Sequence, residues 1–131
     1  MNRFNTARAL AGLSAFGFFL AAGLHVSGYR QVVLQAEQGV GCSPLELGAL
    51  WLAFAAALLV FGVLVVLVAL RRISGGRWVL SLAGCFPLIT VLLQLRLVGF
   101  IPPELTLGAV TVVTLAAALV WPAESSSVLC S

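Results

Sequence analysis

The sequence predicts an all-α integral membrane protein, an antiparallel bundle of four transmembrane helices with both termini on the cytoplasmic side. Apolar residue types make up 62% of the 131 residues and charged types only 8%, whereas about a quarter of the residues of soluble proteins are charged. Four long apolar runs are separated by polar residues, glycine or proline. We therefore expect residues 1–131 to form a single membrane domain.

The first predicted span covers residues 6–29, directly after Arg3 and Arg8. A cleaved signal peptide also begins with basic residues before an apolar run. The run of residues 9–24 is long for such a peptide, and no convincing small-x-small cleavage site follows it. We therefore expect this segment to remain in the protein as a span.

A first outer loop is predicted at residues 30–43. Within it, residues 31–38 have valine and alanine on one side and glutamine on the other, a pattern typical of a short helix lying in the membrane interface. Glycines at positions 39 and 41 should end that helix.

The second predicted span, residues 44–70, is the most apolar of the four. Its uncharged run of residues 47–70 would form a helix about 36 Å long, more than the hydrocarbon layer of about 30 Å requires. Ser43 stands at the N-cap position, Pro44 at the first helical position and Glu46 at the third. This spacing predicts a capping box.

The third and fourth spans are predicted at residues 77–98 and 103–121. A Ser-Gly-Gly turn at residues 74–76 should make the second and third spans antiparallel neighbours. Pro87 falls inside the third span, where it removes a backbone donor and should kink the helix. Tryptophans near the span ends are typical of interfacial anchors, which we expect of Trp78 and Trp121.

Orientation follows from the arginines, because cytoplasmic loops carry an excess of basic residues. With the N-terminus inside, the outer side would hold only Arg30 and Arg96. The inner side would hold the remaining ones: Arg3, Arg8, Arg71, Arg72 and Arg77. Lysine is absent, and alanine, glycine, leucine and valine are abundant, which is typical of a GC-rich bacterial genome. The expected location is the bacterial inner (cytoplasmic) membrane, with several passes.

The cysteines do not predict an internal disulfide. Cys42, Cys85 and Cys130 fall in a loop, within a span and at the C-terminus, so their depths differ by more than a disulfide tolerates. Cys42 is either a free thiol or, if its loop faces an oxidising compartment, a partner for a second chain.

Two helical faces bring polar residues to one side of the membrane. The first span carries a seam of small residues that includes Ser14, Gly17 and Ala21 and leads to His25; such seams are typical of helix contacts in lipid. The third span carries a polar line that ends at Gln94. The second span carries an alanine stripe at positions 49, 53 and 57, predicted to pack within the chain or, alternatively, between two chains.

An outward-facing polar cluster is the candidate ligand-binding or partner-binding site. Each member also has a structural interpretation: a hydrogen bond across the bundle for the histidine and glutamine, stabilisation of a helix start for the glutamates, and interfacial anchoring for the others. The candidate residues are His25, Gln94, Glu46, Glu104, Arg96, Tyr29 and Trp51.

No motif predicts catalysis, a metal or a cofactor. A single histidine cannot form a bis-histidine haem pocket, and no cysteine and histidine spacing matches a zinc site. There is no CxxC pair, Walker motif or dinucleotide glycine motif,. The dispersed arginines form no basic stripe for nucleic acid. We therefore expect a protein that is not an enzyme, with membrane lipids and another membrane protein or itself as partners.

In size and span count the chain is similar to the small multidrug resistance transporters, which act as dimers. That family has a membrane-embedded glutamate in its first span, whereas residues 9–24 contain no acid. The chain also looks like the small immunity proteins that protect bacteria from pore-forming toxins. The leading expectation is a non-enzymatic interaction protein, either an accessory subunit or an immunity-type protein. The alternative is a small-molecule-binding or lipid-binding protein, or a homodimeric small transporter, with an outward-facing polar site.

Overall fold

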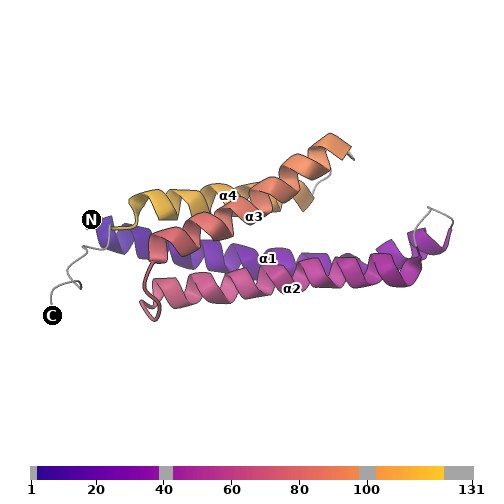
Figure 1. Cartoon of the computed structure of the whole chain (residues 1–131), viewed down its shortest axis with the longest axis horizontal. Coiled ribbons are helices and arrows are strands. Elements are labelled where there is room, and N and C mark those ends of the chain that lie inside the picture. The colour runs from indigo at the N-terminus through magenta and orange to yellow at the C-terminus, as the bar shows by residue number, and fades with distance from the viewer. Residues whose placement is uncertain (1–2, 39–42, 98–102, 123–131) are drawn as a thin grey trace.

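The computed structural model describes residues 3–38, 43–97 and 103–122, which form four helices (Figure 1). The described part contains no strand, which confirms the predicted all-helical fold. In chain order the helices are α1 (Arg3–Glu37), α2 (Pro44–Ala69), α3 (Gly76–Leu97) and α4 (Pro103–Val120).

Three of the helices are long and apolar enough to cross a membrane. They are α1, α2 and the segment Gly76–Arg96 of α3. The apolar segment of α4, Leu105–Val120, is shorter. The structure therefore supports membrane spans in three of the four predicted places by length and composition.

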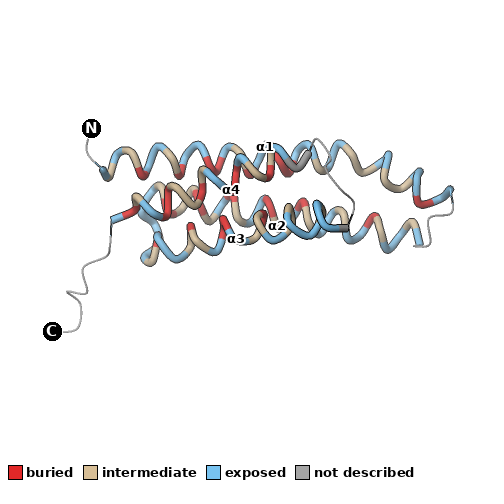
Figure 2. Tube along the Cα trace, turned by 90° about the horizontal axis from the view of Figure 1, so that it is seen from above, coloured by how far each residue is buried: buried red, intermediate tan, exposed pale blue. Residues whose placement is uncertain are grey.

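The helices form a ring in the order α2, α1, α4, α3. The pair α1 and α2 has the most extensive contact, α4 packs against both α1 and α3, and α2 meets α3 over a shorter stretch. The start of α1, the α2–α3 turn and the end of α4 lie at one end of the bundle, called here the turn end (Figure 1). At the opposite end α1 and α2 continue past α3 and α4 (Figures 1 and 2). We call this pair of helix ends, up to Glu37 and from Pro44, the projection.

The first helix does not stop where the sequence predicted a loop. It runs through Tyr29 and Arg30 to Glu37, so residues 31–37 continue α1 and form no separate interfacial helix. No glycine or proline interrupts this stretch, and Ala36 on its inner face is buried, so the backbone continues as helix. The predicted helix end at residues 39 and 41 lies outside the described residues.

The start of α2 has the predicted residues without the predicted capping box. Pro44 stands in the first turn with Glu46, but the Ser43 side chain makes no capping hydrogen bond. The first helical bond instead runs from the Leu47 amide to the Ser43 carbonyl, at 3.0 Å. Ser43 and Glu46 are exposed, so water can satisfy the first amides of the helix.

The end of α2 is a Schellman motif. The Arg71 amide donates to the Val68 carbonyl at 2.9 Å, and the Arg72 amide donates to the Leu67 carbonyl at 2.8 Å. Arg71 occupies the left-handed position that this motif requires, with φ of 58°. Glycine is the usual residue there because it has no Cβ.

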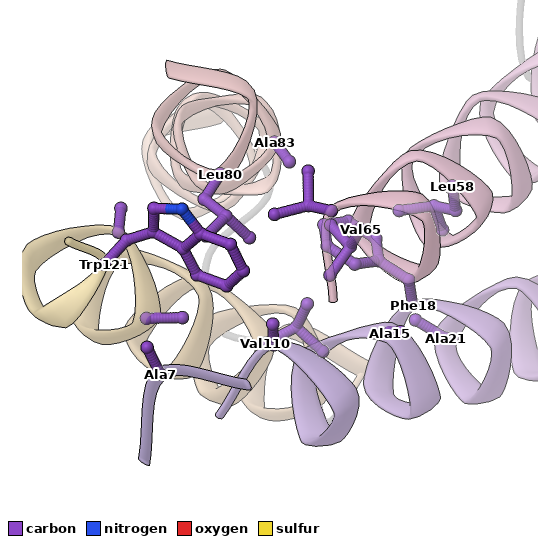
Figure 3. Packing of buried hydrophobic residues seen from close by; sticks show 14 of the residues in the cluster. Ala7, Ala15, Phe18, Ala21, Leu58, Val65, Leu80, Ala83, Val110 and Trp121 are labelled. Carbon is purple, nitrogen blue, oxygen red and sulfur yellow. The ribbon is translucent and has the colours of Figure 1, made fainter. Parts of the chain in front are cut away.

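Large side chains enter the core where the neighbouring helix offers small ones (Figure 3). Alanines line the inner face of α1, and Phe18 of α1 lies beside Val65 of α2. Trp121, predicted to be an interfacial anchor, is packed into the bundle: it is only 8% exposed, and its ring lies 6.1 Å from that of Phe4. Room for its indole comes from Gly76, where an added Cβ would lie 2.7 Å from Trp121 Nε1.

The small-residue seam of α1 is a helix contact, as predicted. Ser14 and Thr114 of α4 are buried with their hydroxyl oxygens 2.5 Å apart. Thr114 donates to the Val110 carbonyl at 2.6 Å, and each hydroxyl carries one hydrogen, so Ser14 donates to Thr114. A Cβ at Gly17 would lie 2.7 Å from Val110 Cγ2, which shows how closely α1 and α4 approach.

The alanine stripe of α2, predicted to pack within the chain, lies largely at the surface of the bundle. Ala49 and Ala53 are exposed and Ala57 is half-buried. The neighbouring face of α2 is buried instead, through Gly48, Ala55, Leu58, Gly62 and Val65. Glycine permits the closer approach: a Cβ at Gly62 would lie 3.0 Å from the Phe19 ring of α1. Cys85 is a free, exposed cysteine, while Cys42 and Cys130 lie outside the described residues.

Candidate functional site

A cavity of about 780 Å³ lies in the half of the bundle nearer the projection and is partly open to the surface. All four helices contribute to its wall, with α1 providing most of it. The lining residues that carry polar side-chain groups are His25, Gln31, Gln35, Trp51, Gln94 and Thr106.

The α1 wall of the cavity is one continuous helical face. His25, Gly28, Val32 and Gln35 all line it and follow each other at spacings of three or four residues, which aligns them on a helix. The glutamines of this wall were not among the predicted site residues, because residues 31–38 were expected to form a separate helix after Tyr29. The signal was present: the spacing runs through that position without a break.

His25 is held between aromatic rings. Its imidazole stacks on the Trp51 indole, with ring centres 3.8 Å apart and planes inclined by 11°, and the Phe54 ring lies 4.7 Å away. Trp51 Nε1 donates to the His25 backbone carbonyl at 2.5 Å. Gly28 makes room for this indole, since a Cβ there would lie 3.3 Å from Trp51 Cζ2. The sequence expectation that the α1 seam carries His25 into the protein is confirmed.

A row of aromatic rings extends from this stack along α2, away from the projection. Phe54 lies 5.5 Å from Phe86 of α3, and Phe86 lies 4.9 Å from Phe61. Phe61 in turn lies 6.1 Å from Phe18 of α1. Aromatic pairs at such distances stabilise a protein beyond the effect of burying their surface. The row therefore joins three helices and holds in place the rings that pack against His25.

Gln94 lines the cavity, but its side-chain oxygen is buried with almost no surface open to it. The side chain is half-buried, and its Oε1 atom is buried with no hydrogen-bond partner among the described residues. It therefore does not accept a bond from His25, the structural role considered from the sequence. One turn earlier Thr90 donates to the Phe86 carbonyl of its own helix at 3.1 Å. A buried acceptor without a partner costs about 1–3 kcal/mol.

The other described candidates, Tyr29, Glu46 and Arg96, do not line this cavity. Tyr29 packs against α2, where a Cβ at Gly48 would lie 3.0 Å from its hydroxyl oxygen. Glu46 is exposed in the first turn of α2, and Arg96 is exposed in the last turn of α3. Glu104 belongs to the first turn of α4, but its side chain lies outside the described part. Of the predicted cluster, the structure brings together His25, Trp51 and Gln94.

Comparison with known proteins adds no residue-level match to this geometry. No family model, curated protein or solved structure matches the chain. The similarities in size and span count to small transporters and immunity proteins therefore stay at the level of architecture.

The cavity can bind a neutral polar group. Among the described residues its lining contains no carboxylate, guanidinium or amine, while amides and a threonine hydroxyl provide both hydrogen-bond donors and acceptors. Leu24, Val32 and Leu107 add apolar surface beside them. Among the described residues no group of three potential metal ligands comes together.

Proposed function

We propose that this chain is an integral membrane protein whose cavity binds a small amphipathic molecule or a lipid. The observation that carries the proposal is the cavity of about 780 Å³, which is lined by His25, Trp51 and Gln94. The buried Oε1 of Gln94 has no hydrogen-bond partner among the described residues. The cavity volume falls within the range of about 300–1,000 Å³ typical of small-molecule pockets. A homodimeric transporter that carries such a ligand is one form of this function.

Membrane insertion is supported by the surface of the bundle. Large apolar side chains are exposed along its length, among them Phe16 at 65% and Leu119 at 73%. Exposed apolar area on this scale is a liability in water, whereas lipid tails cover it in a bilayer. We propose that all four helices cross a bacterial inner membrane with the arginine-rich turn end in the cytoplasm. Resistance of the protein to alkaline carbonate extraction tests insertion.

The chemistry of the wall selects the kind of ligand. A ligand with an N–H or O–H group suits this wall, because rotation of the Gln94 side chain toward the cavity would let its Oε1 accept a hydrogen bond and would remove the cost of leaving it buried and unpaired. The described lining residues carry no charged side chain, which favours a neutral head, because a buried charge without a partner is far more costly. The apolar part of the ligand would lie against Leu24, Val32 and Leu107.

Thermal unfolding of the detergent-solubilised protein with 1-monoolein, a neutral lipid with two hydroxyl donors, tests this function. A ligand that binds only the folded state stabilises it by about 2.7 kcal/mol at a hundred times Kd, so Tm should rise by several degrees. Oleate has the same tail with a carboxylate head and should stabilise the protein less. Gln94→Leu and His25→Ala should each abolish the effect of 1-monoolein.

Thr90→Val is the matched control. Thr90 lies one turn before Gln94 on α3, bonds within its own helix and does not line the cavity, so its loss should leave the ligand effect intact. If Gln94→Leu and His25→Ala leave the ligand-dependent stabilisation unchanged, the cavity is not the binding site and this function is wrong.

The second candidate is a non-enzymatic interaction protein, either an accessory subunit or an immunity-type protein. The projection favours it, because α1 and α2 continue past their neighbours (Figure 1) with Leu34 and Leu45 exposed, the latter at 81%. Native mass spectrometry of the protein excised from its own membrane in lipid-polymer discs tests this candidate. It predicts a second polypeptide at fixed stoichiometry, lost in Leu45→Gln and kept in Leu105→Gln, which alters an exposed leucine of α4. Absence of any stoichiometric partner contradicts it.

A further inference from the structure

At the turn end of the bundle, two arginines share one aromatic ring. The guanidinium carbon of Arg71 lies 5.0 Å from the centre of the Phe4 ring, and that of Arg8 lies 5.8 Å from it. Both distances are within the range of about 6 Å in which a cation is attracted by a ring face. The Phe4 ring of α1 therefore lies close to two guanidinium groups, that of Arg8 from α1 and that of Arg71 from the end of α2.

The backbone of Arg71 makes this arrangement costly. Its φ of 58° is a left-handed conformation that costs a residue with a Cβ about 1–2 kcal/mol. Glycine would meet the same requirement of the Schellman motif without that cost. What arginine adds at this position is its guanidinium, which the structure places over Phe4.

Arg8 is anchored, and its terminal nitrogens have no hydrogen-bond partner among the described residues. Its Nε donates to the Ala69 carbonyl at the end of α2, at 3.0 Å. A guanidinium has five N–H donors, so this bond fixes the orientation of the side chain and leaves its terminal nitrogens for another acceptor. Arg8 and Arg71 are both exposed, so an acceptor can reach them.

The described residues provide no negative charge at this end. The carboxylates of Glu37 and Glu46 lie in the projection, at the opposite end of the bundle. The turn end and its vicinity hold further exposed guanidinium groups, from Arg3, Arg72 and Arg77. Cations gathered in this way repel one another unless an anion lies among them.

We propose that Arg8 and Arg71, arranged around Phe4, bind the phosphate of an anionic phospholipid. Guanidinium groups suit phosphate because parallel N–H groups can bond two of its oxygens. The anion is a lipid headgroup because the helices next to this end carry exposed apolar side chains, including Trp78 at 77%, which acyl chains would cover. This site is separate from the cavity and rests on the proposed membrane insertion.

Native mass spectrometry of the full chain, solubilised with an equimolar mixture of phosphatidylglycerol and phosphatidylcholine, tests the site. The wild-type protein should retain phosphatidylglycerol in preference to phosphatidylcholine. Arg71→Gly should lower that preference about fivefold, as expected for one basic residue at an anionic membrane surface. Glycine suits the left-handed backbone, so this variant should unfold at the same temperature as the wild type or higher. The matched control, Arg96→Gln, removes an exposed arginine near the other end and should keep the preference.

Two outcomes overturn the inference. If Arg71→Gly retains phosphatidylglycerol as selectively as the wild type, the arginines are not the lipid site. If millimolar inorganic phosphate displaces phosphatidylglycerol from the wild type, the site binds free anions and not a lipid. Gln94→Leu should keep the lipid preference, and Arg71→Gly should keep the stabilisation by 1-monoolein, so failure of this site and failure of the cavity are distinguishable.

Discussion

Gly17→Ala tests the close contact of α1 with α4. An added Cβ would lie 2.7 Å from Val110 Cγ2, whereas carbon atoms pack best at about 3.5–4.0 Å. The valine has little freedom to withdraw, because it is 5% exposed and a β-branched side chain in a helix has one preferred χ1 rotamer.

The cost can be worked out from the two ways of relieving this contact. Turning Val110 by about 30° off its rotamer costs about 0.5–1.5 kcal/mol. Separating the helices instead stretches the hydrogen bond between Ser14 and Thr114, which lies one turn away. Such a polar contact in a membrane contributes about 0.6 kcal/mol, and the separation also weakens the packing of the side chains around this bond. We expect Gly17→Ala to lower the free energy of unfolding by about 1–2 kcal/mol, near the lower end of the range for overpacked cores.

The assay is reversible unfolding in mixed micelles, followed by the loss of helical circular dichroism. Gly12→Ala is the matched control, because it makes the same change on the same helix where no atom lies within 4 Å of the added Cβ. That variant should be as stable as the wild type or more stable by up to about 1 kcal/mol, because alanine is a better helix former than glycine. Val110→Ala should partly rescue Gly17→Ala by making room for the methyl group. Equal stabilities of Gly17→Ala and Gly12→Ala would refute the reasoning.

Two further measurements address other contacts of the bundle. A double-mutant cycle of Ser14→Ala with Thr114→Val should give a coupling of about 0.6 kcal/mol and at most about 1.7 kcal/mol; additive single effects would contradict the hydrogen bond between the two hydroxyls. Trp51→Phe keeps an aromatic ring against His25 but removes the donor to its carbonyl, so thermal unfolding should report a loss of about 0.5–1.5 kcal/mol, and an unchanged Tm would show that this bond contributes nothing.

The number and places of the helices were predictable because long apolar runs separated by glycine, proline or charged residues predict separate helices. An apolar run such as residues 47–70 predicts a single long helix. New helices begin in the structure at Pro44, at the turn of residues 74–76 and at Pro103. The end of α1 was harder to predict. Polarity after Tyr29 indicated the edge of the hydrocarbon layer, but a helix ends where its backbone is interrupted, and nothing interrupts it before Glu37.

Contacts between helices were harder to predict than the helices themselves. Every face of α2 is apolar, so the sequence could not distinguish its alanine stripe from the glycine-containing face that packs on α1. Burial of Trp121 depends on the space at Gly76, which is distant in the chain. His25 and Gln94 were predictable from spacing within their own helices. Thr106 of α4 also lines the cavity, but this depends on the order in which the four helices pack around the bundle. The sequence of a single helix does not determine that order.

The unequal lengths of the helices have a consequence for the surrounding bilayer. With 35 residues, α1 extends about 52 Å, whereas α4, with 18 residues, extends about 27 Å. If the chain is inserted as proposed, α1 is longer than a hydrocarbon thickness of about 30 Å, whereas α4 is shorter than that thickness. Lipids beside α4 would have to compress or the bundle would have to tilt, at a cost of a fraction of a kcal/mol per Å of hydrophobic mismatch. The protein should accordingly partition into the thinner regions of a membrane, because the short helix α4 matches a thin hydrocarbon layer best.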